Sequence, residues 1–131
     1  MSGEAQGGVR ILLRVEGACV LAAALFFYSR HDAGWGTFAF FFLAPDLSLF
    51  GYLAGPRVGA LCYNAAHSYI GAIACFLLGA TLASAGFVTA ALIWFAHIGF
   101  DRALGYGLKY SGGFGWTHLG RIGRARVVAD G

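Results

Sequence analysis

Apolar residues along the chain are gathered into four runs, each close to the roughly 20 residues that an α-helix needs to cross a bilayer. The runs cover residues 10–29, 35–54, 58–80 and 87–108. The segments between them are short, and Gly55-Pro56 is a clear stop between the second run and the third. Short connections join sequential antiparallel neighbours, so the pattern predicts an all-α, four-helix transmembrane bundle with up-down-up-down topology.

The composition favours the same interpretation. Hydrophobic residues make up 59% of the 131 residues and charged residues only 11%, whereas a soluble domain carries about 25% charged residues. The chain therefore lacks the polar surface needed to face water, and we expect the lipid bilayer to be its main partner. The net charge of +3 comes with no basic stripe, which argues against nucleic acid as a partner.

The first run has a rival interpretation as a secretory signal peptide, because Arg10 precedes the apolar stretch "ACVLAAALFF". Glu16 interrupts the start of this run, and no clean small-residue cleavage site follows the apolar stretch. A membrane helix is therefore the favoured interpretation.

Basic residues set the predicted orientation. With four spans, both termini share one side of the membrane, and the other side carries Arg30 alone. The basic residues on the side of the termini are Arg10, Arg57, Lys109, Arg121, Arg124 and Arg126. Such residues favour the cytoplasmic side, so we expect a multi-pass inner-membrane protein with both termini cytoplasmic. Its parts would be a polar N-terminal tail (residues 1–9), the transmembrane domain (10–109) and a Gly/Arg-rich cytoplasmic tail (110–131).

Each predicted helix also carries polar side chains within its apolar run. Counted from the cytoplasmic end of each run at 1.5 Å per residue, all of them fall in one slab roughly 9–16 Å deep. Ionisable groups in a membrane face the bundle interior or a wet cavity, so we expect one shared interior cluster. Its members are Glu16, Asp46, Asn64, His67, His97 and Asp101.

Two arginines border the predicted cluster. Arg102 lies about 100° around the helix from Asp101, so it would either neutralise a carboxylate on a neighbouring helix or extend to the cytoplasmic headgroups. Arg14 is expected to extend to the headgroups and leave Glu16 facing inward.

Pro45 stands beside Asp46 within the second run. A proline there would kink the helix and expose the backbone carbonyl of Phe41. The kink would either shape a site or serve packing alone.

The residue types of the cluster suit three kinds of chemistry. Carboxylate and imidazole ligands on facing helices are typical of di-metal bundles, although this chain offers His-x-x-x-Asp and Asn-x-x-His in place of Glu-x-x-His. The same groups would serve a proton relay, because imidazole titrates near neutral pH. A haem held between His67 and His97 is the third alternative. The three nearby acids argue against it, because they would place anions beside an apolar macrocycle.

We favour a small, metal-assisted membrane enzyme that acts on a lipid or another apolar substrate. A divalent Zn, Fe or Mn ion would be bound by His67, His97 and Asp101. The catalytic groups would be Glu16, Asp46 and Asp101, with Asn64 and Arg102 as orienting residues. The alternatives are a proton-coupled small-molecule carrier working as a homodimer, with Glu16 and Asp46 as exchange sites, and a structural or accessory membrane subunit.

The polar tail contains two further candidates. His118 and Arg121 would fold back and cap the cluster, or the tail would act only as a basic segment that holds the C-terminus in the cytoplasm.

The stretches "FFLAPDLSLFGYLAG", "YNAAHSY", "HIGFDRALGYGLKY" and "THLGRIG" resemble a bacterial integral-membrane family, domain of unknown function 4260. The resemblance covers residues 12–123 and is most specific over residues 97–109. It implies a small four-helix membrane protein and no particular activity.

Overall fold

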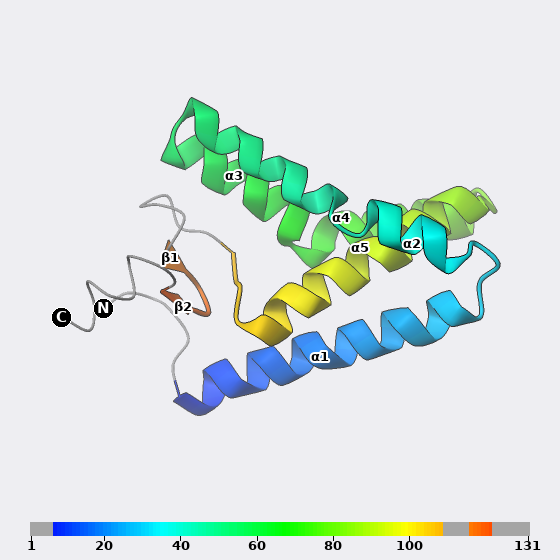
Figure 1. Ribbon diagram of the computed structural model, residues 1–131, viewed down its shortest axis with the longest axis horizontal. Coiled ribbons are helices and arrows are strands. Elements are labelled where there is room, and N and C mark those ends of the chain that lie inside the picture. Colours follow the sequence, from blue (N-terminus) through cyan, green and yellow to red (C-terminus); the bar gives the residue numbers. More distant parts are fainter. Residues whose placement is uncertain (1–6, 109–115, 122–131) are drawn as a thin grey trace.

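A computed structural model describes residues 7–108 and 116–121 of the chain. Within these ranges the fold is all-α apart from one very short hairpin (Figure 1). The helices are α1 (Gly7–Ser29), α2 (Trp35–Phe41), the 3-10 helix η1 (Ala44–Ala54), α3 (Pro56–His67), α4 (Tyr69–Thr81) and α5 (Ala85–Leu104). The hairpin pairs β1 (Trp116–Thr117) with β2 (Gly120–Arg121) in antiparallel register, Trp116 opposite Arg121 and Thr117 opposite Gly120.

The apolar segments have the lengths and the surface of membrane helices. Three of them, α1, α2–η1 and α5, are long and apolar enough to cross a membrane, and the bent pair α3–α4 makes a fourth if it is one span. Large apolar side chains such as Phe40 and Leu53 are 80% and 87% exposed. A soluble monomer rarely exposes so much apolar surface. This is the surface expected of helices that lie in a membrane, and the up-down order and the cytoplasmic termini remain predictions.

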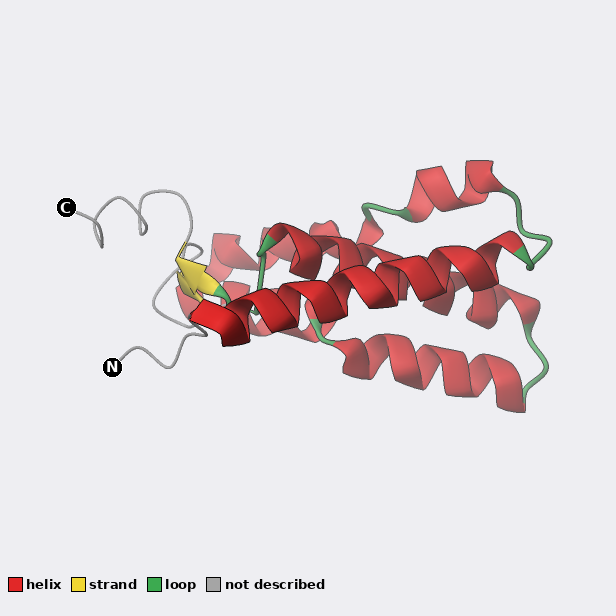
Figure 2. Ribbon diagram, turned by 90° about the horizontal axis from the view of Figure 1, so that it is seen from below, coloured by secondary structure: helices red, strands yellow, loops and turns green. Residues whose placement is uncertain are grey.

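Helix α5 lies at the centre of the described part of the chain. Eight of its residues are buried, whereas α2 and η1 bury none. Helix α1 runs alongside α5, as Figures 1 and 2 both show, and α4 packs against α5 as well. The 3-10 helix η1 and α3 form a second packed pair.

Helices α1 and α5 touch at two glycines. A Cβ atom added at Gly17 would lie 2.3 Å from the Cβ of Arg102, and one added at Gly99 would lie 2.7 Å from the carbonyl oxygen of Gly17. Small residues allow membrane helices to approach this closely. The contact fixes α5, with the polar residues it carries, against the longest helix of the chain.

The second apolar run is not the single kinked helix that the sequence predicted. Helix α2 ends at Phe41, and the chain passes through Phe42 and Leu43 into the 3-10 helix η1. Pro45 has no N–H group and disfavours α-helical geometry at the residue before it, which prevents α2 from continuing. The carbonyl that reaches the polar cluster belongs to Phe42 rather than to the expected Phe41.

The third run is also broken, which the sequence analysis did not predict. The chain bends by 42° between α3 and α4, at Ser68, whose φ of −88° and ψ of 152° lie outside the helical region. Two α5 side chains bind carbonyls at the end of α3. Trp94 Nε1 donates to the carbonyl of Ala66 (2.5 Å), and Arg102 Nη2 donates to that of His67 (3.0 Å). Packing against α5 therefore stabilises the break.

Helix α5 ends four residues earlier than predicted. Gly105 adopts a left-handed conformation with φ of 93°. Its N–H donates to the carbonyl of Arg102, and the N–H of Tyr106 donates to that of Asp101. This arrangement is the glycine-dependent helix stop known as a Schellman motif, and it keeps Asp101 and Arg102 in the last turn of α5.

Candidate metal centre

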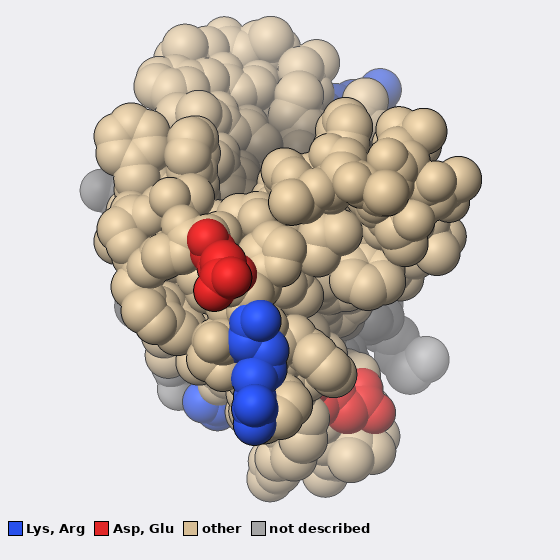
Figure 3. Space-filling model, turned by 90° about the vertical axis from the view of Figure 1, so that its right-hand side faces the viewer, with Lys and Arg blue, Asp and Glu red and all other residues tan. Residues whose placement is uncertain are grey.

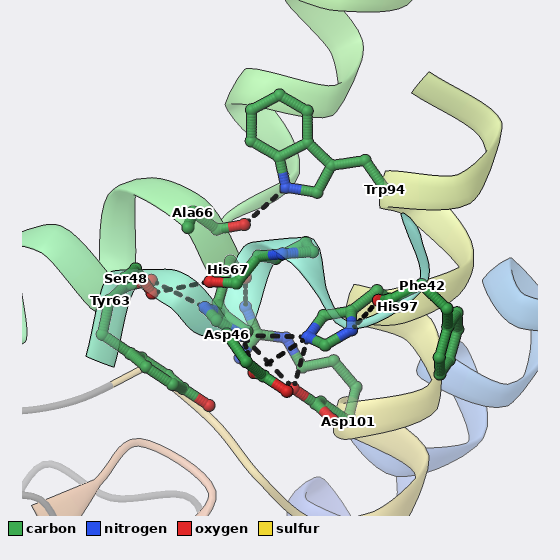
Figure 4. Close-up of polar contacts among 11 residues, drawn as sticks. Phe42, Asp46, Ser48, Tyr63, Ala66, His67, Trp94, His97 and Asp101 are labelled. Atoms are coloured by element: carbon green, nitrogen blue, oxygen red, sulfur yellow. Dashed lines mark hydrogen bonds and ion pairs between the residues drawn. The ribbon is translucent and has the colours of Figure 1, made fainter. Parts of the chain in front are cut away.

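Four polar side chains meet where the two chain breaks lie beside α5 (Figure 4). Asp46 stands in the first turn of η1, and His67 is the last residue of α3. His97 and Asp101 are four residues apart on α5, hence on one face of that helix. Three separate elements thus supply the four groups.

One atom of each side chain faces a common point. The Nε2 atom of His67 lies 3.0 Å from the Nε2 atom of His97, 3.0 Å from Asp46 Oδ1 and 3.5 Å from Asp101 Oδ2. The Nε2 atom of His97 lies 3.2 Å from each of these carboxylate oxygens. A tetrahedral ion with ligands at about 2.0–2.2 Å separates them by about 3.3–3.6 Å. The distances from the two Nε2 atoms, 3.0–3.5 Å, are close to this range, and all four atoms lie within 4.8 Å of one another.

Backbone carbonyls determine which nitrogen of each ring carries a proton. His67 Nδ1 lies 2.9 Å from the carbonyl oxygen of Tyr63, and His97 Nδ1 lies 2.6 Å from that of Phe42. A carbonyl only accepts hydrogen bonds, so Nδ1 is the donor in both rings. In the neutral tautomer each Nε2 atom then directs a lone pair at the common point. Ligating histidines are commonly oriented by such a bond.

This arrangement requires positive charge at its centre. With neutral imidazoles and ionised carboxylates, four electron-pair donors face one another at the distances given above. The two histidines are 2% and 1% exposed, so bulk water does little to weaken the repulsion. Two carboxylates and the single positive charge of the nearby Arg102 leave a net charge of −1 (−2 + 1). A cation or additional protons at the common point would balance it.

Aromatic rings fix the two imidazoles, while one carboxylate is open to the surroundings. The ring of Tyr63 stacks on His67 with centroids 3.8 Å apart, and Phe42 meets His97 edge to face at 5.3 Å. The side chain of Asp46 is 37% exposed, against 17% for Asp101. Access to the cluster is therefore greatest on the side of Asp46.

The chain's family follows from a match over most of its length. The sequence profile of the family Domain of unknown function (DUF4260) matches residues 10–122. The chain belongs to this family. The match confirms the resemblance seen in the sequence, and it includes all four clustered residues. No curated protein and no solved structure matches the chain.

One predicted cluster member of this DUF4260 protein lies elsewhere, and the orienting role predicted for Asn64 stays a prediction. Glu16 is exposed on α1 and supplies no atom to the cluster, so the prediction that it faces the interior is wrong. The reason is its neighbour Gly17, which takes the buried position against α5 and leaves Glu16 turned about 100° away. Asn64 is half-buried on α3, and its backbone carbonyl accepts the N–H of Ser68 at the break.

Arg102 is buried, with 7% exposure. Instead of reaching a headgroup or a neighbouring carboxylate, its guanidinium donates to the backbone carbonyl of His67 and lies 5.8 Å from the ring centroid of Tyr69. A positive charge at the last carbonyls of a helix is also favourable for the helix dipole. The contact places Arg102 directly behind a cluster residue, where an orienting role stays a prediction.

The groups that bind the cluster from behind leave little trace in the sequence. The carbonyls of Phe42 and Tyr63 carry no signature in a sequence, although Pro45 marks the neighbourhood of the first. Tyr63 precedes His67 by one helical turn, which is the only signal for that contact. In the sequence, nothing distinguishes Trp94 from the other apolar residues of the fourth run.

The hairpin packs against the segment that follows α5. The N–H of Leu108 donates to His118 Nδ1 (2.8 Å), the N–H of His118 donates to the carbonyl of Leu108 (3.0 Å), and Leu119 is fully buried. Burial, together with the positive charge of Arg102, lowers the pKa of His118 to about 4. The Nδ1 atom of His118 can accept this hydrogen bond only while the imidazole is neutral. His118 supplies no atom to the cluster, and the side chain of Arg121 lies outside the described residues.

Proposed function

We propose that the chain is a metal-dependent membrane enzyme that holds one divalent ion between His67, His97, Asp46 and Asp101. The observation that carries the proposal is the convergence of two Nε2 atoms, each with its tautomer set by a backbone carbonyl, and two carboxylate oxygens. Mixed imidazole and carboxylate ligands suit Zn, Fe or Mn. Asp46, expected from the sequence as a catalytic group only, joins the three expected ligands.

The accessibility of Asp46 supports catalysis over a purely structural ion. Structural sites are closed by four protein ligands, whereas catalytic sites keep one position for water or substrate. Asp46 is the most exposed of the four and belongs to η1, which has no buried residue. It is therefore the ligand best able to give way to a substrate oxygen. A divalent ion at this position would supply Lewis-acid polarisation and an acidified water.

Elemental analysis of protein purified in mild detergent without chelator tests the proposal. We expect about one Zn, Fe or Mn per chain in the wild type. His97→Gln keeps a polar side chain of similar size but removes a ligand, so it should lose most of the metal while the helices stay folded. Wild-type protein with less than about one ion per several chains would end the metal proposal.

His31→Gln is the matched control for the His97 variant. His31 lies in the loop between α1 and α2, where its Nε2 atom bonds the hydroxyl of Thr89 at 2.6 Å. It is a half-buried histidine outside the cluster. Its replacement should leave the metal content unchanged. Equal metal loss in both variants would point to general destabilisation rather than to a lost ligand.

A proton relay is the second candidate, because Asp46 Oδ1 lies within hydrogen-bond distance of both histidine Nε2 atoms. In this case an imidazolium supplies the positive charge at the common point. The wild type would then carry no stoichiometric metal, and ¹⁵N NMR of the two histidines would show coupled titration. The version with Glu16 as a second exchange site has less support, because Glu16 is exposed and outside the cluster.

A further inference from the structure

An apolar cavity of about 630 Å³ opens beside the cluster, between α2, the start of η1 and α5. Eight of its ten lining residues are apolar or glycine, and the other two are Thr37 and Thr89. Figure 3 shows the end of the molecule that carries the α1–α2 loop. This face is hollowed between two lobes that bear no charged side chains. The lining of the cavity itself thus contains no charged side chain.

The cavity and the His/Asp cluster follow one another along the same face of α5. The lining residues Gly86, Ala90 and Ile93 are spaced by four and three residues, and two further steps of four reach His97 and then Asp101. The α5 part of the lining runs from Gly86 to Trp94, a rise of about 12 Å along the helix. The cavity therefore ends within one helical turn of the cluster.

The part of the cavity wall that η1 supplies also ends at the His/Asp cluster. Pro45 lines it and is the residue directly before Asp46, the most exposed member of the cluster. Trp94 lines it as well and stands one turn before His97. A molecule that fills the cavity would thus have one end at Asp46.

Thr89, one of the two polar residues that line the cavity, already has hydrogen-bond partners within the chain. Thr89 Oγ1 donates to the carbonyl of Ala85 (2.8 Å) and accepts from His31 Nε2 (2.6 Å). It has no remaining donor for a ligand. A headgroup therefore finds better partners at the cluster end than at the loop end.

We propose that this cavity binds a single hydrocarbon chain of an amphiphilic substrate drawn from the bilayer, with its polar end at the cluster. The substrate assignment rests on the proposed metal enzyme, whereas the chain-binding site rests on the cavity alone. Its volume lies within the 300–1,000 Å³ typical of small-ligand sites, which suits one chain rather than a two-chain phospholipid. Because α2 and η1 bury no residue, this wall faces lipid, and the chain enters between α2 and α5.

Fluorescence quenching of Trp94 tests the assignment. The chain has three tryptophans, so Trp35→Phe and Trp116→Phe together leave Trp94, inside the cavity, as the only one. Titration of this protein in nanodiscs with 11-bromoundecanoic acid should give saturable quenching. Ala90→Phe fills the cavity from α5 without touching a cluster residue and should weaken binding by about tenfold or more.

Ala39→Phe is the matched control. Ala39 is exposed on α2, about 200° around the helix from the lining residues Thr37 and Phe41, so this change should leave quenching as it is. Unsaturable quenching, or equal quenching with Phe at position 90, overturns the assignment. Saturable quenching in protein that lacks metal overturns the enzyme but not the chain site. Metal-bound protein without saturable quenching overturns the chain site alone.

Discussion

The bond from Arg102 to the carbonyl of His67 connects α5 to the end of α3 immediately behind a cluster histidine. Arg102→Met keeps most of the apolar volume of the side chain and removes its donors. The carbonyl is then left in a buried position at the break between α3 and α4, where no water reaches it easily. Because His67 is the residue whose carbonyl is released, the imidazole loses part of its positioning as well.

The expected losses of stability and of metal affinity follow from these contacts. A hydrogen bond to a charged donor contributes about 1.5–3 kcal/mol, and an unsatisfied buried acceptor costs about 1–3 kcal/mol. Removing the buried charge offsets part of this, since a buried ion carries its own desolvation cost. We expect a net loss of about 1–3 kcal/mol in the free energy of unfolding. Loss of a group that orients a ligand typically lowers metal affinity by about 10–100-fold.

Arg14→Met provides a matched comparison at the same end of α5. Arg14 also donates to a backbone carbonyl, that of Ala103 at 3.0 Å, but it is exposed. Unfolding in mixed micelles and chelator competition for bound Zn measure the two effects. The Arg14 variant should lose less than about 1 kcal/mol and keep its metal affinity. If the two variants behave alike, or if Arg102→Met binds metal as the wild type does, the orienting role is refuted.

Three further predictions concern other parts of the chain. The lowered pKa of His118, about 4, means that docking of the hairpin is at full strength above pH 6.5 and is lost as the pH falls towards 4, since protonation removes the Nδ1 acceptor. The protection factors of residues 116–121, which compare measured exchange with the intrinsic rate at each pH, should therefore fall between pH 7 and pH 5, and unchanged protection factors would contradict this. Gly99→Ala should destabilise the protein to mixed-micelle unfolding by about 1–3 kcal/mol, whereas Gly86→Ala, which meets only the hydroxyl of Ser84 at 3.9 Å, should not. Reporter fusions after residue 131 and within residues 83–86 should read opposite sides of the membrane, and the same side for both would exclude four spans.

The sequence could predict how far along its helix each candidate site residue lies, and hence its depth in a membrane. The rise per residue of a helix is fixed, so counting along each apolar run placed Asp46, His67, His97 and Asp101 at one level. Azimuth was less predictable, because it depends on which residue packs against a neighbouring helix. Glu16 lies at the right depth, yet Gly17 occupies the contact with α5 and turns the carboxylate outward.

The two helix breaks also differ in cause: one is local, and the other depends on tertiary contacts. Pro45 interrupts its run through its own covalent structure, and the sequence showed a disturbance there. Nothing local marks Ser68. That break exists because Trp94 and Arg102, about 30 residues later in the chain, bind the carbonyls at the end of α3. Hydropathy predicts the number of apolar segments, but it carries no information on such partners.

The position of the four clustered residues along the chain has a consequence for biosynthesis. Asp46 and His67 leave the ribosome well before His97 and Asp101, so when the first two segments to carry cluster residues are made, each has only the other as a partner. An ionisable residue at mid-helix costs about 2.5–3.5 kcal/mol at insertion. The last helix to be made, α5, supplies the partners for both and fits into a space that the earlier helices leave open. A chain released before α5 is complete would hold the Asp46–His67 pair without His97 and Asp101, and such an incomplete polar cluster in lipid would make it a natural substrate for membrane quality control.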